Sequence, residues 1–120
     1  MGKHAKNKPL LELTEAQIQR QCLEYLNYNG FYAFRYNSGL VRVIRNRNQT
    51  GMVKLGEAGM PDILALRDGQ FYGFEIKRMG KKSTTIQTLT QKKLTNFGAK
   101  VYEIHSLDEL HEDLKAILIK

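Results

Sequence analysis

The sequence predicts an α/β domain in which helices cover a central sheet on both sides. Three helix starts carry a capping box, in which Ser or Thr and a Glu or Gln three residues later satisfy each other's backbone amides. These boxes begin at Thr14, Thr84 and Ser106. Between the first two, residues 63–76 form a hairpin pattern with apolar side chains on both faces, which need cover on each side. The expected order is helix, three strands, helix, strand, helix.

The length and composition fit one globular domain. The chain has 120 residues, and we expect a single domain over residues 11–120 after a flexible basic tail over residues 1–10. No apolar run approaches the roughly 18 residues that cross a membrane, and the first residues lack the apolar segment of a secretory signal. We therefore expect a cytoplasmic protein with no membrane partner.

The charge balance favours a polyanionic partner. Nineteen Lys and Arg residues against twelve Asp and Glu residues give a net charge of +7. Composition alone leaves DNA, RNA and acidic lipid open. Cys22 is the only cysteine, which excludes an intramolecular disulfide and a cysteine-based zinc site. We expect no small-molecule cofactor.

The first helix begins after Thr14 and runs to about Asn29, with Gly30 placed for the left-handed conformation that follows a helix. Its apolar face contains Ile18, Cys22, Leu23 and Leu26. Glu15 lies three residues before Ile18, hence near the buried side. Two explanations stay open for Glu15: it favours the helix dipole in the first turn, or it has a partner on the buried side.

A first strand over residues 31–36 overlaps a long basic segment. Residues 35–54 carry five cations and no acid: Arg35, Arg42, Arg45, Arg47 and Lys54. Apolar residues alternate around Arg42, which indicates a short exposed strand or arm. Its polar tip is expected at Asn46, Asn48, Gln49, Thr50 and Gly51. Such an arm would grip phosphates through its guanidinium groups; an ordinary solvated loop is the alternative.

The central hairpin turns at Asp68-Gly69, the dipeptide that best fits a two-residue type I′ turn. With this turn, Asp62 lies directly opposite Glu75, and Lys77 points the same way. Like charges that face each other destabilise a strand pair, which suggests a bound cation, and oxygen ligands suit Mg²⁺ or Mn²⁺. A hairpin whose charged ends lie in solvent explains the same residues equally well.

A basic connection joins the hairpin to the second helix and adds three candidate phosphate contacts, Arg78, Lys81 and Lys82. The second helix covers residues 84–97 and ends at Gly98. Gln87 occupies the N3 position of its cap, which is a sufficient structural role. The last strand covers residues 100–104, and the last helix begins at Ser106.

Two motifs carry a resemblance to known nucleases. Pro61-Asp62, followed after twelve residues by Glu75-Ile76-Lys77, resembles the signature of the PD-(D/E)xK nuclease superfamily. More narrowly, Gly59-Met60-Pro61-Asp62 with the same downstream motif resembles the virus-type replication-repair nuclease (VRR-NUC) family in its stand-alone, phage-like form. This resemblance covers residues 14–110. It implies a restriction-endonuclease-like core with a mixed central sheet flanked by helices.

The resemblance also implies roles for individual residues. It places the ligands of Mg²⁺ or Mn²⁺ at Glu15, Asp62, Glu75 and the backbone carbonyl of Ile76. Lys77 would position or deprotonate the attacking water, or stabilise the developing charge. Gln87 matches a Gln that faces the active site in the family, and Gln91, one turn later, is the alternative.

The activity implied is that of a metal-dependent, structure-specific DNA endonuclease that hydrolyses phosphodiester bonds. Stand-alone members of this length resemble Holliday-junction resolvases, which act on branched DNA as homodimers because a four-way junction needs two symmetric incisions. A flap or splayed-arm nuclease of the same fold is the nearest alternative. From another class, a non-catalytic nucleic-acid-binding module would keep the acids for folding, and RNA as substrate stays open.

Overall fold

The computed structural model describes residues 12–36, 39–46 and 49–118. The predicted basic tail over residues 1–10 and the candidate phosphate contact Arg47 lie outside the described residues. The elements are α2 (Glu15–Tyr28), β1 (Tyr32–Arg35), β2 (Gly39–Asn46), β3 (Gln49–Leu55), β4 (Ile63–Arg67), β5 (Gln70–Ile76), α3 (Thr85–Asn96), β6 (Lys100–Ile104) and α4 (Leu107–Leu118).

The central sheet is mixed and has four strands, in the order β1-β4-β5-β6. Strand β4 pairs antiparallel with both β1 and β5, whereas β5 and β6 are parallel. The prediction of an α/β fold with a mixed sheet is therefore confirmed. The predicted element order was incomplete, because two further strands, β2 and β3, form a separate ribbon between β1 and β4.

The register of the central hairpin follows from its turn. Asp68 and Gly69 both have positive φ, 52° and 78°, as a type I′ turn requires. The pairs then follow in order along β4 and β5, from Arg67 opposite Gln70 to Ile63 opposite Phe74. The predicted register is confirmed, and it places Asp62 and Glu75 together at the open end of the hairpin.

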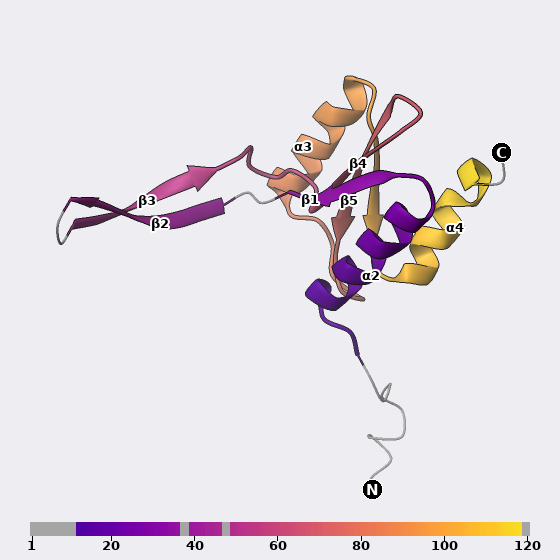
Figure 1. Ribbon diagram of the computed structural model, residues 1–120, viewed down its shortest axis with the longest axis horizontal. Coiled ribbons are helices and arrows are strands. Elements are labelled where there is room, and N and C mark those ends of the chain that lie inside the picture. Colours follow the sequence, from indigo (N-terminus) through magenta and orange to yellow (C-terminus); the bar gives the residue numbers. More distant parts are fainter. Residues whose placement is uncertain (1–11, 37–38, 47–48, 119–120) are drawn as a thin grey trace, which may run out of the picture.

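Helices α2 and α4 cover one face of the sheet, where Figure 1 shows them side by side. The buried core on this face combines three residues of α2, two of α4 and alternate residues of the strands. Its largest fully buried apolar side chains are Phe74, Leu26, Ile63, Ile76, Ile104, Leu110 and Leu114. Burial of these side chains stabilises the sheet and both helices together.

Helix α3 contacts the opposite face of the sheet. Strand side chains alternate, so Glu75 points away from its core neighbours Phe74 and Ile76 and meets Gln87 of α3. The large apolar residues of α3 are mostly in solvent: Ile86, Leu89 and Phe97 are 59%, 63% and 87% exposed. This helix is therefore held by polar contacts more than by a buried apolar face.

Capping boxes open α2 and α3 as predicted. In each, the Thr hydroxyl accepts from the Gln three residues later, and that Gln accepts from the Thr backbone amide. At α4 half of the predicted box forms, since Ser106 Oγ accepts from the Glu109 amide at 3.1 Å. The Glu109 carboxylate accepts from the His105 amide at 2.6 Å instead of from the Ser106 amide. The second hydrogen bond of the box is therefore made to the residue before the one predicted.

The β2–β3 ribbon projects from the body of the molecule (Figure 1). The sequence predicted a short exposed strand or arm, and the structure makes it an antiparallel pair with an irregular register between Ile44 and Asn46. Of the predicted polar tip, Gln49, Thr50 and Gly51 belong to β3 and Asn46 ends β2, so these residues pair within the ribbon; Asn48 lies outside the described residues.

Candidate active site

Asp62 is fixed where the chain enters β4. Its backbone carbonyl accepts from the Tyr36 amide, and its side-chain Oδ2 accepts from the Ile76 amide, both at 2.8 Å. Pro61, the preceding residue, packs flat against Gly73, where an added Cβ would lie only 2.7 Å from the proline ring. The glycine therefore makes room for the proline that orients Asp62.

The turn before Asp62 is pressed against α3. Gly59 has a φ of +78°, and an added Cβ would lie 2.7 Å from the Ile86 carbonyl oxygen. Thr90 Oγ1 donates to the carbonyl of Ala58 at 2.9 Å and joins the same turn to the helix. Close backbone approach and a positive φ both require glycine here. The Gly59-Met60-Pro61-Asp62 motif thus has a structural cause.

Glu75 is the buried acid of the site, with 1% of its surface exposed. Its Oε2 accepts from Gln87 Nε2 at 2.9 Å and lies 3.8 Å from Lys77 Nζ. Its Oε1 is also buried. When Glu75 is ionised, this oxygen has no hydrogen-bond partner among the described residues. Such an atom is costly to bury unless a proton or a cation satisfies it.

The two carboxyls titrate abnormally because they are buried together. Burial, then the negative charge of Asp62, raises the pKa of Glu75 to about 8, although Lys77 opposes the shift. Burial also raises the pKa of Asp62, against the lowering effects of the Ile76 amide and a hydrogen bond with Glu75. At neutral pH the pair therefore holds a proton unless a cation replaces it.

Glu15 approaches this pair from the first turn of α2. Its Oε2 accepts from the Arg78 amide at 3.3 Å, and its charge acts on both Asp62 and Glu75. The structure therefore brings Glu15, Asp62, Glu75, Lys77 and Gln87 together. Of the two candidate glutamines, Gln87 is the one that donates a hydrogen bond to Glu75, whereas Gln91 donates to Ser83 Oγ. Among the described residues, no three carboxylate, histidine or cysteine side chains gather into a complete metal-ligand set.

A pocket of about 530 Å³ opens beside Glu15 and Lys77. Its lining combines four cations with the N-cap threonines of α2 and α3, so that it is strongly positive. The lining residues are Thr14, Glu15, Lys77, Arg78, Lys81, Lys82 and Thr84. Three predicted phosphate contacts, from the loop after β5, thus meet in one pocket that adjoins the acids.

The other predicted phosphate contacts are spread along the chain. Arg35 is exposed at the end of β1, opposite Ile63, and Arg42 is exposed on β2. Arg45 and Lys54 lie on the ribbon strands, with their side chains outside the described part of the structure. The structure therefore separates a basic pocket at the acids from a basic ribbon that projects away from them.

Sequence reasoning missed a polar cluster next to the basic loop, which we define as residues 78–83. Ser83 donates its amide (2.9 Å) and its hydroxyl to Glu103 Oε1. His105 lies 3.3 Å from Glu103 and 3.0 Å from Glu109. Glu103 and His105 are two residues apart at the end of a strand, and this spacing could have indicated a shared face.

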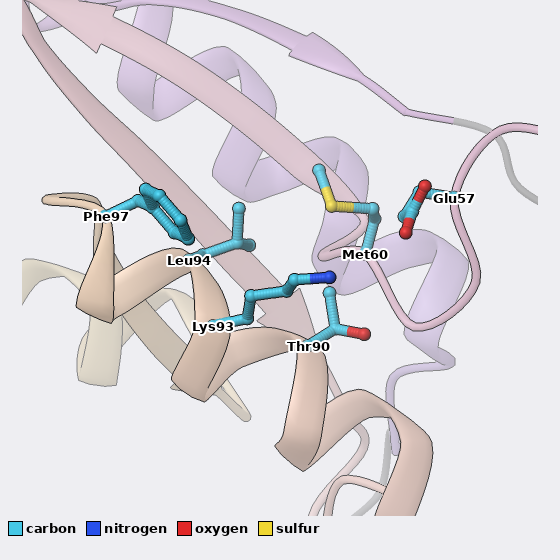
Figure 2. Close-up of a pocket in the computed structure, with 6 residues that line it drawn as sticks. All are labelled: Glu57, Met60, Thr90, Lys93, Leu94 and Phe97. Carbon is cyan, nitrogen blue, oxygen red and sulfur yellow. The ribbon is translucent and has the colours of Figure 1, made fainter.

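A second pocket, of about 250 Å³, lies between α3 and the segment that precedes β4. Figure 2 shows Met60 and Glu57 on one side of this pocket, facing Thr90, Lys93 and Leu94 of α3, with Phe97 beyond Leu94. Its lining is largely apolar and includes none of Glu15, Asp62, Glu75 and Lys77. It is therefore a separate feature from the candidate active site.

Comparison of the chain with models of protein families gives no match, and comparison with curated proteins gives no match either. No helix in the described part of the chain has the length and apolar character needed to cross a bilayer. The case for the candidate site therefore depends on its residues and their geometry.

Proposed function

We propose that this protein is a metal-dependent DNA endonuclease with a PD-(D/E)xK core, of the VRR-NUC kind, that hydrolyses phosphodiester bonds in branched DNA. One observation carries the proposal. Half-buried Asp62 and buried Glu75 act on each other's charge, Lys77 Nζ lies 3.8 Å from Glu75, and one oxygen of Glu75 has no partner among the described residues. With both carboxyls ionised the pair destabilises the fold, because like charges held close together repel, and a bound cation would remove this cost.

A divalent cation fits the donor set. Asp62, Glu75 and the carbonyl of Ile76 offer hard oxygen ligands, as Mg²⁺ and Mn²⁺ prefer, and Glu15 adds a further carboxylate beside them. The unpartnered Oε1 of Glu75 is the atom that a cation would satisfy. When bound, the ion would acidify a water molecule and offset negative charge on the phosphate.

Lys77 and Gln87 then have separate tasks. The ammonium group of Lys77 lies 3.8 Å from Glu75 Oε2, where it would orient water and stabilise negative charge that develops on the phosphate. Gln87 donates to Oε2 of Glu75 and so leaves Oε1 as the free ligand atom. The N3 position of the cap fixes the helix turn from which Gln87 reaches the acid.

The basic surfaces support branched DNA as the substrate. The pocket beside the acids suits a phosphate next to the cleaved bond, while the projecting ribbon extends the positive surface to a second arm of the DNA. A four-way junction offers such arms, and two symmetric incisions require a two-fold homodimer. We therefore propose resolution of four-way junctions as the activity.

The test is cleavage of end-labelled four-way junction, flap, splayed-arm and duplex DNA with Mg²⁺ or Mn²⁺. We expect paired, symmetric nicks in the junction and a loss of roughly 100-fold or more in Asp62→Ala and Lys77→Ala. Circular dichroism confirms that the variants fold.

Two other results have defined meanings. Cleavage of flaps or splayed arms alone would keep the chemistry and remove the case for a junction-resolving dimer. If the wild type and both variants bind junctions equally well and cut nothing, the protein is a nucleic-acid-binding module and the proposal is wrong.

A further inference from the structure

His105 joins three elements behind the basic loop. His105 directly follows β6, and its Nε2 lies 2.8 Å from the Lys81 carbonyl oxygen in the loop. Its Nδ1 lies 3.0 Å from Glu109 Oε1 on α4, and Nε2 also lies 3.3 Å from Glu103 Oε2 on β6. The side chain is 21% exposed, so most of the ring is enclosed by these partners.

Every polar atom that faces this ring is an acceptor. A neutral imidazole has one N–H and one bare nitrogen, whereas the imidazolium has two N–H groups. In the neutral form, either Nδ1 would face the Glu109 carboxylate without a proton, or Nε2 would face the Lys81 carbonyl and Glu103 without one. The observed contacts are therefore all satisfied only by the protonated ring.

The contacts of the ring extend into the loop and the start of α3. Glu103, beside His105, accepts from both the amide and the hydroxyl of Ser83, and Gln91 of α3 donates to the same hydroxyl at 3.0 Å. Ser83 directly precedes the N-cap of α3, so the cluster holds the loop at its middle and at its end.

We propose that His105 is a positioning residue: its imidazolium form holds residues 78–83 in place, and with them the lysines that offer the pocket to phosphate. Lys81 and Lys82 both line that pocket. Loss of the proton from His105 then releases the Lys81 carbonyl or the Glu109 carboxylate. The last step, from loop position to DNA affinity, depends on the proposed function; the first step does not.

The charges around the ring agree with this assignment. Burial lowers the pKa of His105, but the hydrogen bonds to the Lys81 carbonyl and to Glu109, with the charges of Glu109 and Glu103, outweigh it and raise the pKa above its ordinary value. Among the described groups that face the ring, the titratable ones are thus two acids, from β6 and α4. A raised pKa means that the loop is held below it and released as the pH rises through it.

The test combines two measurements on the full chain, in chelator so that no DNA is cut. Nuclear magnetic resonance of the His105 ring and of the loop amides, from pH 5.5 to 9, follows the proton and the loop in the wild type. Fluorescence anisotropy follows binding of a labelled four-way junction over the same range. The variants are His105→Gln and, as a matched control, His111→Gln, which removes a histidine of α4 that contacts Tyr25.

We expect both ring nitrogens of His105 to be protonated at pH 6, and the loop signals to shift as the ring deprotonates. Junction affinity should fall roughly three- to tenfold at the midpoint of the His105 ring in the wild type and in His111→Gln; this step should be absent from His105→Gln, in which only the proton loss of the Glu75 pair remains. A ring with one N–H at pH 6, loop signals that do not follow the ring, or an affinity that is unchanged while the ring titrates would each overturn the inference. Absence of cleavage would count against the proposed function alone.

Discussion

The β4–β5 hairpin and the β2–β3 ribbon are both antiparallel strand pairs, but they have opposite surroundings and opposite charge. The hairpin lies inside the four-stranded sheet; at its open end Glu75 is buried and Asp62 is half-buried. The ribbon stands apart as its own two-stranded sheet and exposes a cation, Arg42. Acids are thus placed where protein can hold an ion, and bases where they can reach phosphates.

This contrast separates the consequences of substitution. Changes at the hairpin disturb packed backbone and buried charge, so we expect them to affect stability and the proposed cleavage together. Changes on the ribbon disturb a solvent-exposed surface, so we expect them to affect the proposed binding of DNA and its dependence on salt. Each comparison below pairs a variant with a control in a similar local structure.

The largest effect is expected for Gly59→Ala. The new Cβ would strain a residue with φ of +78° and press on the backbone of α3, at a cost of roughly 2–4 kcal/mol in unfolding free energy. Gly69→Ala is the control, because Gly69 has the same φ but no atom within 4 Å of the added carbon. Urea unfolding measures both; an equal loss in the two variants would show that contact with α3 contributes nothing.

A smaller effect is expected for Gln87→Ala. Gln87 caps α3 and also donates to Glu75, whereas Gln17 has the same N3 role at α2 and bonds with Thr14. Both alanine variants should lose about 1 kcal/mol of stability, but only Gln87→Ala should slow cleavage, by roughly 10- to 100-fold. Cleavage rates at saturating metal decide this. Equal cleavage rates in the two variants would show that Gln87 acts only as a helix cap.

The smallest effect is expected for Arg42→Ala on the ribbon. Its unfolding midpoint should match that of the wild type, while the dissociation constant for junction DNA rises a few-fold and the salt slope of binding falls by about 1. Arg42→Lys keeps the charge and should keep the slope. Anisotropy titrations at several salt concentrations measure this, and an unchanged slope in Arg42→Ala would remove the ribbon from the DNA-binding surface.

The sequence predicted those parts of the fold that depend on local chemistry. The Asp68-Gly69 turn fixed the register of the hairpin, and with it the meeting of Asp62 and Glu75, because a two-residue turn leaves one pairing. The first two capping boxes located α2 and α3 for a similar reason, since N-cap and N3 residues lie within one turn of helix.

Features that depend on distant contacts were not predictable in this way. The Glu109 carboxylate turns to His105 instead of completing its own cap, because the ring is presented to it by a different element. The exposure of Phe97 and Leu89 likewise depends on how α3 meets the sheet, and an apolar helix pattern cannot reveal that. The sequence has no strong turn signal between the two strands of the ribbon, so the second strand was not predicted.

The buried acid pair also predicts a dependence of stability on pH. Because the pKa of Glu75 is raised from 4.5 to about 8 on folding, the folded state holds a proton that the unfolded state has lost between these values. The free energy of unfolding in chelator should therefore fall as the pH rises through this window. Glu75→Gln removes the titrating group, so its stability should fall less over the same range, and a fall equal to that of the wild type would contradict the assignment.

The most direct test of the central claim is calorimetric titration of Mn²⁺ into the protein at pH 7, in two buffers with different heats of ionisation. We predict that the wild type binds Mn²⁺ with release of about one proton, because the ion replaces the proton held by Asp62 and Glu75. Asp62→Asn should lose this binding. If the wild type binds no Mn²⁺, or if Asp62→Asn binds it equally well, the buried carboxyl pair is not a metal site.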